Sequence, residues 1–314
     1  MSKYLNVFNT LAEYQAFSAS TEYVQPNVAL VKETNVLYYD YGDNKPQADL
    51  SDYKLESEET SVGGDKYGNS AITKVNYIPS GITSMPYTFE GYTSLVNAPE
   101  IPSGVTSMYG TFNKCTSLVT VPVIPDSVTN MNSTFSNCSS LVTAPEIPSG
   151  VTDMSYTFIA CTSLVNAPVI PSGVTYMSYT FRNCTSLVTA SEIPNSVTNM
   201  SSTFFGCSNL VNVPVIPDSV TDMSSTFNGC TSLVNAPVIP NSVTNMSSTF
   251  SGCTSLKEVT FLHTTPPSYK NTLSGCSKLE SIYVPDEAVD TYKTATKWSA
   301  FASKIKPLSK KPSE

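Results

Sequence analysis

A phenylalanine recurs at a constant interval of 23 residues through the middle of the chain, and this period constrains the fold more than any other feature. The eight positions are Phe89, Phe112, Phe135, Phe158, Phe181, Phe204, Phe227 and Phe250. Leucine, methionine, isoleucine and proline keep the same interval, and the unit reads approximately IPxxVTxMxxTFxxCTSLVxAPx. A repeat of this length predicts a stack of similar structural units.

A single unit is too small to fold alone. Burial of its five or six apolar side chains contributes roughly 10 kcal/mol, whereas ordering its backbone costs about 1–2 kcal/mol per residue, which is more. Neighbouring units must therefore share apolar edges and backbone hydrogen bonds. We predict a solenoid with one coil per unit, a rise of about 4.8 Å per coil, and the Phe, Leu, Met and Cys side chains inside.

Within each unit we expect two short parallel strands, the main one at SLVxA and a second at VTxM. The two prolines of APxIP lack an N–H for an inter-coil ladder, so they mark a corner that bounds the main strand. The segment xxTFxxC is interpreted as a single helical or 3₁₀ turn on the opposite side of the coil.

The unit resembles the BspA-type leucine-rich repeats, whose signature approximates IPxxVxxIxxxAFxxCxxLxxI, and the VTxMxxMFxxCxSL repeats of bacterial surface proteins. The similarity covers about residues 78–284, and its most specific element is FxxCxSL. This sequence differs in having Met where Ile is common, Thr before Phe, and a second proline after Ala. The resemblance implies a right-handed leucine-rich-repeat solenoid and extracellular attachment, because such proteins occur on host-associated bacteria, on some protists and in phage particles.

Four segments follow from this reading: residues 1–43, 44–77, 78–284 and 285–314. The first is expected to be a small α+β unit, with a helix capped by Thr10 and Glu13, and a hairpin that turns near Thr34 and Asn35. The second is expected to be a linker or N-terminal cap, and the third is the solenoid. The fourth is predicted to be a capping helix that begins at Pro285, followed by a tail. Its cap would use Val289, Tyr292, Trp298, Phe301 and Ile305.

Charge is scarce, and this limits the partners. Charged residues make up 13% of the chain and the formal net charge is −8, which disfavours nucleic acid and anionic membranes. Between residues 78 and 256 only Lys114 and Arg182 are basic, beside eight acidic residues. No apolar run reaches the ~18 residues that a membrane span needs, and the first residues do not read as a secretory signal.

The eight cysteines invite a disulfide or a metal, but they share one position in the repeat. We interpret Cys115, Cys138, Cys161, Cys184, Cys207, Cys230, Cys253 and Cys276 as an interior column of reduced thiols. No metal or other cofactor is expected, because the column offers no cluster of ligands around one point. His263, the only histidine, is expected at the surface or in the cap, and without a nucleophile beside it no catalysis is predicted.

Binding residues are sought at positions that vary while the core does not. The residue after each phenylalanine is Ile159, Arg182 and Phe205 in three adjacent units, and tyrosines lie near them. The candidate ligand-binding residues are Tyr156, Ile159, Tyr176, Tyr179, Arg182 and Phe205. Tyr, Arg and exposed apolar groups are typical of interaction hot spots. The alternative is drift at positions that face solvent.

Two other columns allow alternatives. Glu100, Glu146 and Glu192 alternate with valines, which indicates either an acidic binding stripe or avoidance of repulsion between carboxylates ~5 Å apart. Duplication of two-unit blocks would give the same pattern. Columns of threonine raise the possibility of ice binding, but VTxM lacks the second threonine of a flat TxT face.

The sequence as a whole indicates a non-enzymatic adhesion or receptor-binding protein at an extracellular surface or on a virion. A protein or glycan is the expected partner, and residues 1–43 are candidates for docking to other virion proteins. A bacterial adhesin and a purely structural spacer are the alternatives. Neither nucleic-acid binding nor membrane insertion is expected.

Overall fold

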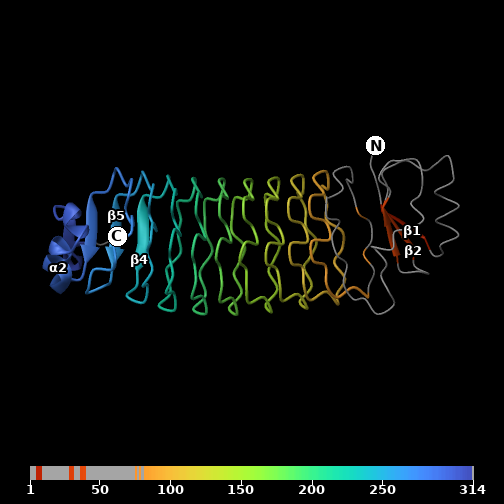
Figure 1. Ribbon diagram of the computed structural model, residues 1–314, viewed down its shortest axis with the longest axis horizontal. Coiled ribbons are helices and arrows are strands. Elements are labelled where there is room, and N and C mark those ends of the chain that lie inside the picture. Colours follow the sequence, from red (N-terminus) through yellow and green to blue (C-terminus); the bar gives the residue numbers. More distant parts are fainter. Residues whose placement is uncertain are drawn as a thin grey trace.

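The computed structural model describes residues 5–8, 28–31, 36–39, 75, 78 and 81–312. From residue 81 onward the chain winds into successive coils that lie side by side along the long axis of the molecule (Figure 1). Two ladders of parallel bridges join residues 23 positions apart, one from Ser84 to Asn245 and the other from Asn97 to Thr120 and again from Thr143 to Asn212. The coils therefore stack in register, and the solenoid predicted from the period is confirmed.

Both predicted strands lie on these ladders, but in most coils each is reduced to a single bridge. Among the described coils, longer strands occur towards the C-terminus, where β4 (Asn235–Ile239), β5 (Glu258–Phe261), β6 (Ser281–Val284) and β7 (Ile305–Pro307) form a parallel sheet in that order. In most regular coils a proline stands two residues after the bridge position and cannot donate to a ladder; β4 continues past the equivalent Pro237 with a register shift between Asn235 and Val238.

The expected helical turn at xxTFxxC is wrong, because the described coils contain turns without a helix at this segment. Hydrogen bonds there alternate in direction. The Phe181 N–H donates to Thr203 O of the next coil at 2.9 Å, whereas the Arg182 N–H donates back to Tyr179 O at 3.2 Å. Tyr179 (φ 60°) and Asn183 (φ 59°) are left-handed, and two such residues four positions apart prevent a continuous right-handed helix.

The core is a set of interior columns. The phenylalanines from Phe89 to Phe250 are at most 4% exposed, and successive rings stack with centroids 5.4–5.7 Å apart. Buried methionine, leucine, valine and cysteine columns run beside them. The prediction that these side chains face inward is therefore confirmed.

The threonine before each phenylalanine is also buried, which removes this column from any ice-binding face. Its hydroxyl serves the backbone: Thr180 Oγ1 lies 3.0 Å from Met154 O of the preceding coil and 2.8 Å from Met177 O of its own coil. These buried carbonyls have no access to water, so the hydroxyl column is a structural requirement.

We predict that Thr180→Val lowers the free energy of unfolding by about 1–2 kcal/mol, since valine keeps the shape but leaves buried carbonyls with one donor fewer. Thr185→Val is the matched control. Thr185 is exposed and its hydroxyl makes one long contact, 3.5 Å, to Thr162 O. Urea unfolding of both variants checks this, and equal losses would show that the buried hydroxyl has no special role.

Towards the N-terminus the structure describes three strands, β1 (Leu5–Phe8), β2 (Val28–Val31) and β3 (Val36–Tyr39). Strands β2 and β3 pair antiparallel, as the predicted hairpin requires, and β1 adds to β2 in parallel. The sequence analysis did not predict β1. The predicted helix capped by Thr10 and Glu13 lies outside the described residues.

The C-terminal segment is not the one helix that was predicted. It contains short elements, η2 (Asp286–Ala288), α2 (Val289–Thr294), η3 (Trp298–Phe301) and η4 (Leu308–Lys310), together with strand β7. Extended backbone at Ala295 and left-handed backbone at Lys297 (φ 66°) end the helix early. Tyr292, Trp298 and Ile305 are buried in the core cluster all the same. Within the described residues, no helix has the length and apolar character needed to cross a bilayer.

Candidate ligand-binding surface

The six predicted binding residues lie on three consecutive coils, in three columns. Tyr176 is five residues before its phenylalanine, Tyr156 and Tyr179 are two before theirs, and Ile159, Arg182 and Phe205 directly follow theirs. Tyr156 and Tyr176 are 40% and 51% exposed, and the other four are half-buried. We call this set the aromatic patch: Tyr156, Ile159, Tyr176, Tyr179, Arg182 and Phe205.

Four members of the aromatic patch touch in series. The rings of Tyr156 and Tyr179 stack with centroids 4.8 Å apart and an interplanar angle of 5°. The guanidinium carbon of Arg182 lies 5.4 Å from the Tyr179 ring centroid and 4.0 Å from that of Phe205. Ile159 shares a coil with Tyr156. Tyr176 lies in a neighbouring column, and no ring contact joins it to the others among the side chains the structure describes.

The two stacked tyrosines occupy a backbone conformation that suits small residues. Every residue two before the phenylalanine position is left-handed, and Tyr156 and Tyr179 have φ of 61° and 60°. The other members of this column are Tyr87, Gly110, Ser133, Ser202, Ser225, Ser248 and Asn271. For a bulky residue this left-handed backbone is less stable than right-handed backbone by about 1 kcal/mol. Stability alone thus does not favour tyrosine, and such strain is typical of functional sites.

Tyr176 also replaces a residue that stabilises its coil. In five other coils the same position is Asn or Asp, whose side-chain oxygen accepts the N–H two residues later at 2.7–3.3 Å. Those residues are Asn130, Asp153, Asn199, Asp222 and Asn245. A tyrosine ring cannot make this local turn. All three tyrosines of the patch therefore stand where the scaffold favours another residue.

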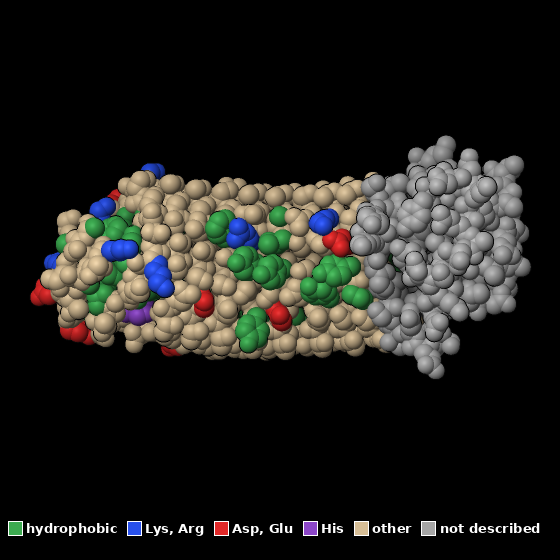
Figure 2. All heavy atoms as spheres, viewed as in Figure 1, with side chains coloured by type: hydrophobic (Ala, Val, Ile, Leu, Met, Phe, Trp, Pro, Cys, Tyr) green, Lys and Arg blue, Asp and Glu red, His purple; other side chains and the backbone are tan. Residues whose placement is uncertain are grey.

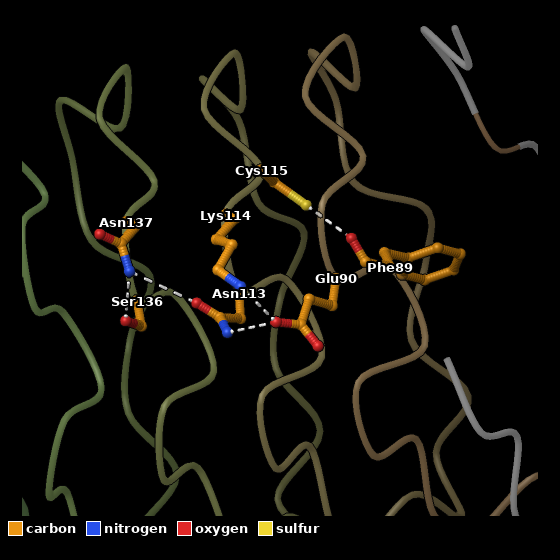
Figure 3. Close-up of polar contacts among 7 residues, drawn as sticks. All are labelled: Phe89, Glu90, Asn113, Lys114, Cys115, Ser136 and Asn137. Atoms are coloured by element: carbon orange, nitrogen blue, oxygen red, sulfur yellow. Dashed lines mark hydrogen bonds and ion pairs between the residues drawn. The ribbon is translucent and has the colours of Figure 1, made fainter. Parts of the chain in front are cut away.

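In the N-terminal coils the column that contains Arg182 holds a polar network (Figure 3). Asn113 Nδ2 and Lys114 Nζ both donate to Glu90 Oε1 at 2.9 Å, and the Asn137 amide contacts Ser136 and Asn113. Lys114 and Glu90 form the one ion pair recorded in the described part of the chain. The two basic residues between 78 and 256 thus differ: Lys114 is neutralised by a carboxylate, whereas Arg182 rests on aromatic rings.

The cysteine column makes no site for chemistry. All eight thiols are free and buried, and each donates to the carbonyl of the phenylalanine in the preceding coil, for example Cys184 Sγ to Phe158 O at 3.0 Å. Burial raises the pKa of these thiols well above the usual range, so nucleophilic thiolate is suppressed. Among the described residues, no group of three or more His, Cys, Asp or Glu could hold a metal ion.

His263 is buried, so a surface position is wrong. Its Nε2 lies 2.7 Å from Val243 O and its ring packs near Phe261. Because a carbonyl only accepts, Nε2 carries the proton, and Nδ1 has no recorded partner among the described residues. Burial lowers the pKa of His263 and holds the ring neutral. This is a core histidine that supports the last coils.

A surface stripe of valine was not predicted from the sequence. The residue directly after the buried leucine is exposed by 37–49% in seven consecutive coils, and Val123, Val169 and Val215 of the Glu-containing column are 81–85% exposed. In the view of Figure 2 hydrophobic side chains gather in separate groups along the solenoid, with few charged side chains among them. The signal was present as an invariant valine in SLV, but strand periodicity alone does not tell which side faces water. The seven are Val96, Val119, Val142, Val165, Val188, Val211 and Val234.

Comparison with known families decides the class of protein. The model of the BspA type leucine rich repeat region matches in 6 copies over residues 60–188, 155–261 and 223–304. The chain belongs to this family. No curated protein sequence matches it.

Solved structures of bacterial leucine-rich-repeat proteins also match parts of this chain. A leucine rich repeat protein of T. pallidum is 27% identical, with 55% of this chain and 78% of that chain covered and a TM-score of 0.42. A leucine-rich repeat protein from Bacteroides ovatus is 20% identical, with 85% and 77% covered and a TM-score of 0.43. A leucine rich cell surface protein from Faecalibacterium prausnitzii is 21% identical, with 77% and 86% covered and a TM-score of 0.33.

The family's repeat pattern distinguishes the buried residues of this BspA-type chain from its surface residues. The element FxxCxSL supplies the buried Phe, Cys and Leu of each coil, as at Phe181, Cys184 and Leu187. Arg182 occupies an unspecified position of that element. The family pattern therefore accounts for the buried residues. The positions that it does not specify hold the residues that distinguish this protein.

Proposed function

We propose that this BspA-type protein is a non-enzymatic adhesin that binds a protein ligand through the aromatic patch. The observation that carries the proposal is the local disadvantage of its tyrosines: Tyr156 and Tyr179 take left-handed backbone, and Tyr176 replaces a turn-forming Asn or Asp. Drift would favour the residues of the neighbouring coils. The three tyrosines are partly exposed and lie near an arginine, an isoleucine and a phenylalanine. This mixture of residue types is that of a binding hot spot.

We place the protein at an extracellular surface, that of a bacterial cell or of a virion. In this proposal residues 78–284 form a right-handed solenoid that presents the patch, and residues 285–314 cap its end. Residues 44–77 join the solenoid to a docking unit at 1–43, which contains β1, β2 and β3. The scarcity of charge in the solenoid supports a partner other than nucleic acid.

The chain itself supplies the variant that tests this function. Serine occupies the left-handed position of the tyrosines in four other coils, at Ser133, Ser202, Ser225 and Ser248, with φ of 54–58°. The double variant Tyr156→Ser, Tyr179→Ser should therefore fold with undiminished stability. We expect it to bind at least about tenfold more weakly to the ligand found in a surface-plasmon-resonance screen of matrix proteins and mucins.

The matched control is Val165→Ser, Val188→Ser, which changes two exposed side chains of the same coils outside the patch. Its binding should equal that of the wild type. Equal binding of wild type and the tyrosine variant would remove the patch as the binding site. A screen in which the wild-type protein binds nothing would favour a structural spacer.

A further inference from the structure

Arg182 is held in one orientation before any ligand arrives. Its guanidinium carbon is 4.0 Å from the Phe205 ring centroid, on the next coil, and 5.4 Å from the Tyr179 ring centroid, on its own coil. Contact with the ring faces restricts the rotamers of a side chain that is otherwise among the most flexible. Less conformational entropy remains to be lost on binding.

The charge of Arg182 is not neutralised by the described residues. The ion pair recorded there joins Lys114 to Glu90, and none involves Arg182. A guanidinium that rests its plane on aromatic rings keeps its N–H groups at the edge of that plane, and these donors match the two oxygens of a carboxylate. Lys114, by contrast, has an acidic partner, because its Nζ donates to Glu90 Oε1 at 2.9 Å.

The neighbours of Arg182 favour a polypeptide over a sugar. A pyranose ring stacks on open aromatic faces. Beside Arg182, Tyr156 and Tyr179 each cover one face of the other at 4.8 Å and Arg182 covers a face of Phe205, whereas the exposed Tyr176 lies outside this series. The aliphatic Ile159 lies on the preceding coil, in the same column as Arg182. An apolar side chain of a peptide can pack here beside a carboxylate.

We propose that the ligand of the aromatic patch presents a single Asp or Glu flanked by apolar residues, and that Arg182 determines specificity by binding its carboxylate. This inference rests on the proposed function. A run of acidic residues does not suit the surface, because the protein has a net charge of −8 and only one unpaired cation at the patch. In this proposal Arg182 binds one carboxylate of the ligand through two N–H groups.

A random peptide library displayed on phage, selected on the immobilised full-length protein, tests this chemistry. We expect enriched peptides to contain Asp or Glu next to apolar residues. In each synthetic peptide, replacing the acid by its amide should weaken binding at least about tenfold, as should Arg182→Gln in the protein. Combining both changes should add little beyond either, because they remove the same contact.

Arg182→Lys is the matched control for geometry. It keeps the charge but loses the planar fork and the ring contacts, so its affinity should fall between those of wild type and Arg182→Gln. Both variants should keep the wild-type melting temperature, since Asn and Ser occupy this position in other coils.

Enriched peptides that lack an acid, amide peptides that bind equally well, unchanged binding by Arg182→Gln, or no enrichment would each overturn the inference. Competition by sialyllactose or hyaluronan fragments in place of peptides would overturn it in favour of an acidic glycan. If Tyr156→Ser, Tyr179→Ser abolishes binding while Arg182→Gln does not, the proposed function stands and the carboxylate inference falls. If neither variant matters, the proposed function falls as well.

Discussion

Replacing Phe181 by alanine should lower the free energy of unfolding by about 3–5 kcal/mol. Phe181 is 1% exposed and its ring stacks between Phe158 and Phe204, with centroids 5.6 and 5.7 Å away. Hydrogen bonds to the coils on both sides hold the backbone, so the neighbouring rings cannot collapse into the space that the ring leaves. The loss thus includes both the transfer of the ring and the cavity.

Guanidinium unfolding followed by two signals measures this effect. Far-UV circular dichroism reports on all coils, and the fluorescence of Trp298, the single tryptophan, reports on the C-terminal ones. If nearest-neighbour contacts couple the coils, both midpoints should move to lower denaturant, although Trp298 lies several coils from Phe181. Val188→Ala on the same coil, at a 37% exposed residue, should change the stability by less than about 1 kcal/mol. Similar losses for the two variants would contradict the stacked core.

The core could be predicted because the period alone determines which side chains share a column. Once Phe112 and Phe135 occupy equivalent positions in stacked coils, burial of one requires burial of the other. The same logic applies to Cys115 and Cys138, which share an interior column and so resemble neither a disulfide framework nor a metal site. The repeat thus identifies the buried positions, which one unit alone would not identify.

The turn segment could not be predicted from the spacing of apolar residues, because a helix and this run of turns bury the same side chains. A signal did exist in the second left-handed column, two residues after each phenylalanine. Beside Lys114 and Ala160, this column holds asparagines and the glycines Gly91, Gly206, Gly229 and Gly252, and Gly and Asn are the residues that most readily adopt positive φ. A column rich in Gly and Asn is therefore better evidence for left-handed backbone than for a helix.

The composition of the candidate surface could be read from the sequence, but its internal contacts could not. Variation after each phenylalanine singled out Ile159, Arg182 and Phe205. That Arg182 lies over Phe205 depends on the side-chain direction set by the left-handed residues on either side of this position. For a similar reason the sequence left His263 open between the surface and the cap. The repeat pattern fails there, and periodicity no longer indicates whether a residue faces inward.

Thiol labelling of the folded protein should occur at Cys276 long before the other seven cysteines. Cys276 is 8% exposed and burial raises its pKa to about 11, whereas the cysteines from Cys115 to Cys253 are 0% exposed. At pH 8 a thiol with a pKa of about 8.5 is roughly one quarter ionised, but a pKa of about 11 leaves about one thiolate in a thousand. Labelling of Cys276 should thus be roughly 200-fold slower than in the unfolded chain.

The other seven thiols should be labelled only after the coils open, because neither thiolate nor reagent is present in the closed interior. Iodoacetamide labelling with mass-spectrometric assignment of each site measures the order. Between pH 7 and pH 9 the rate at Cys276 should rise about a hundredfold, since the thiolate fraction grows tenfold per pH unit below the pKa. Cys276→Ser should remove the early product, and all eight sites should react together in denaturant. Early labelling of Cys184, in the middle of the stack, would show that the thiol column is open to water and would contradict the closed solenoid.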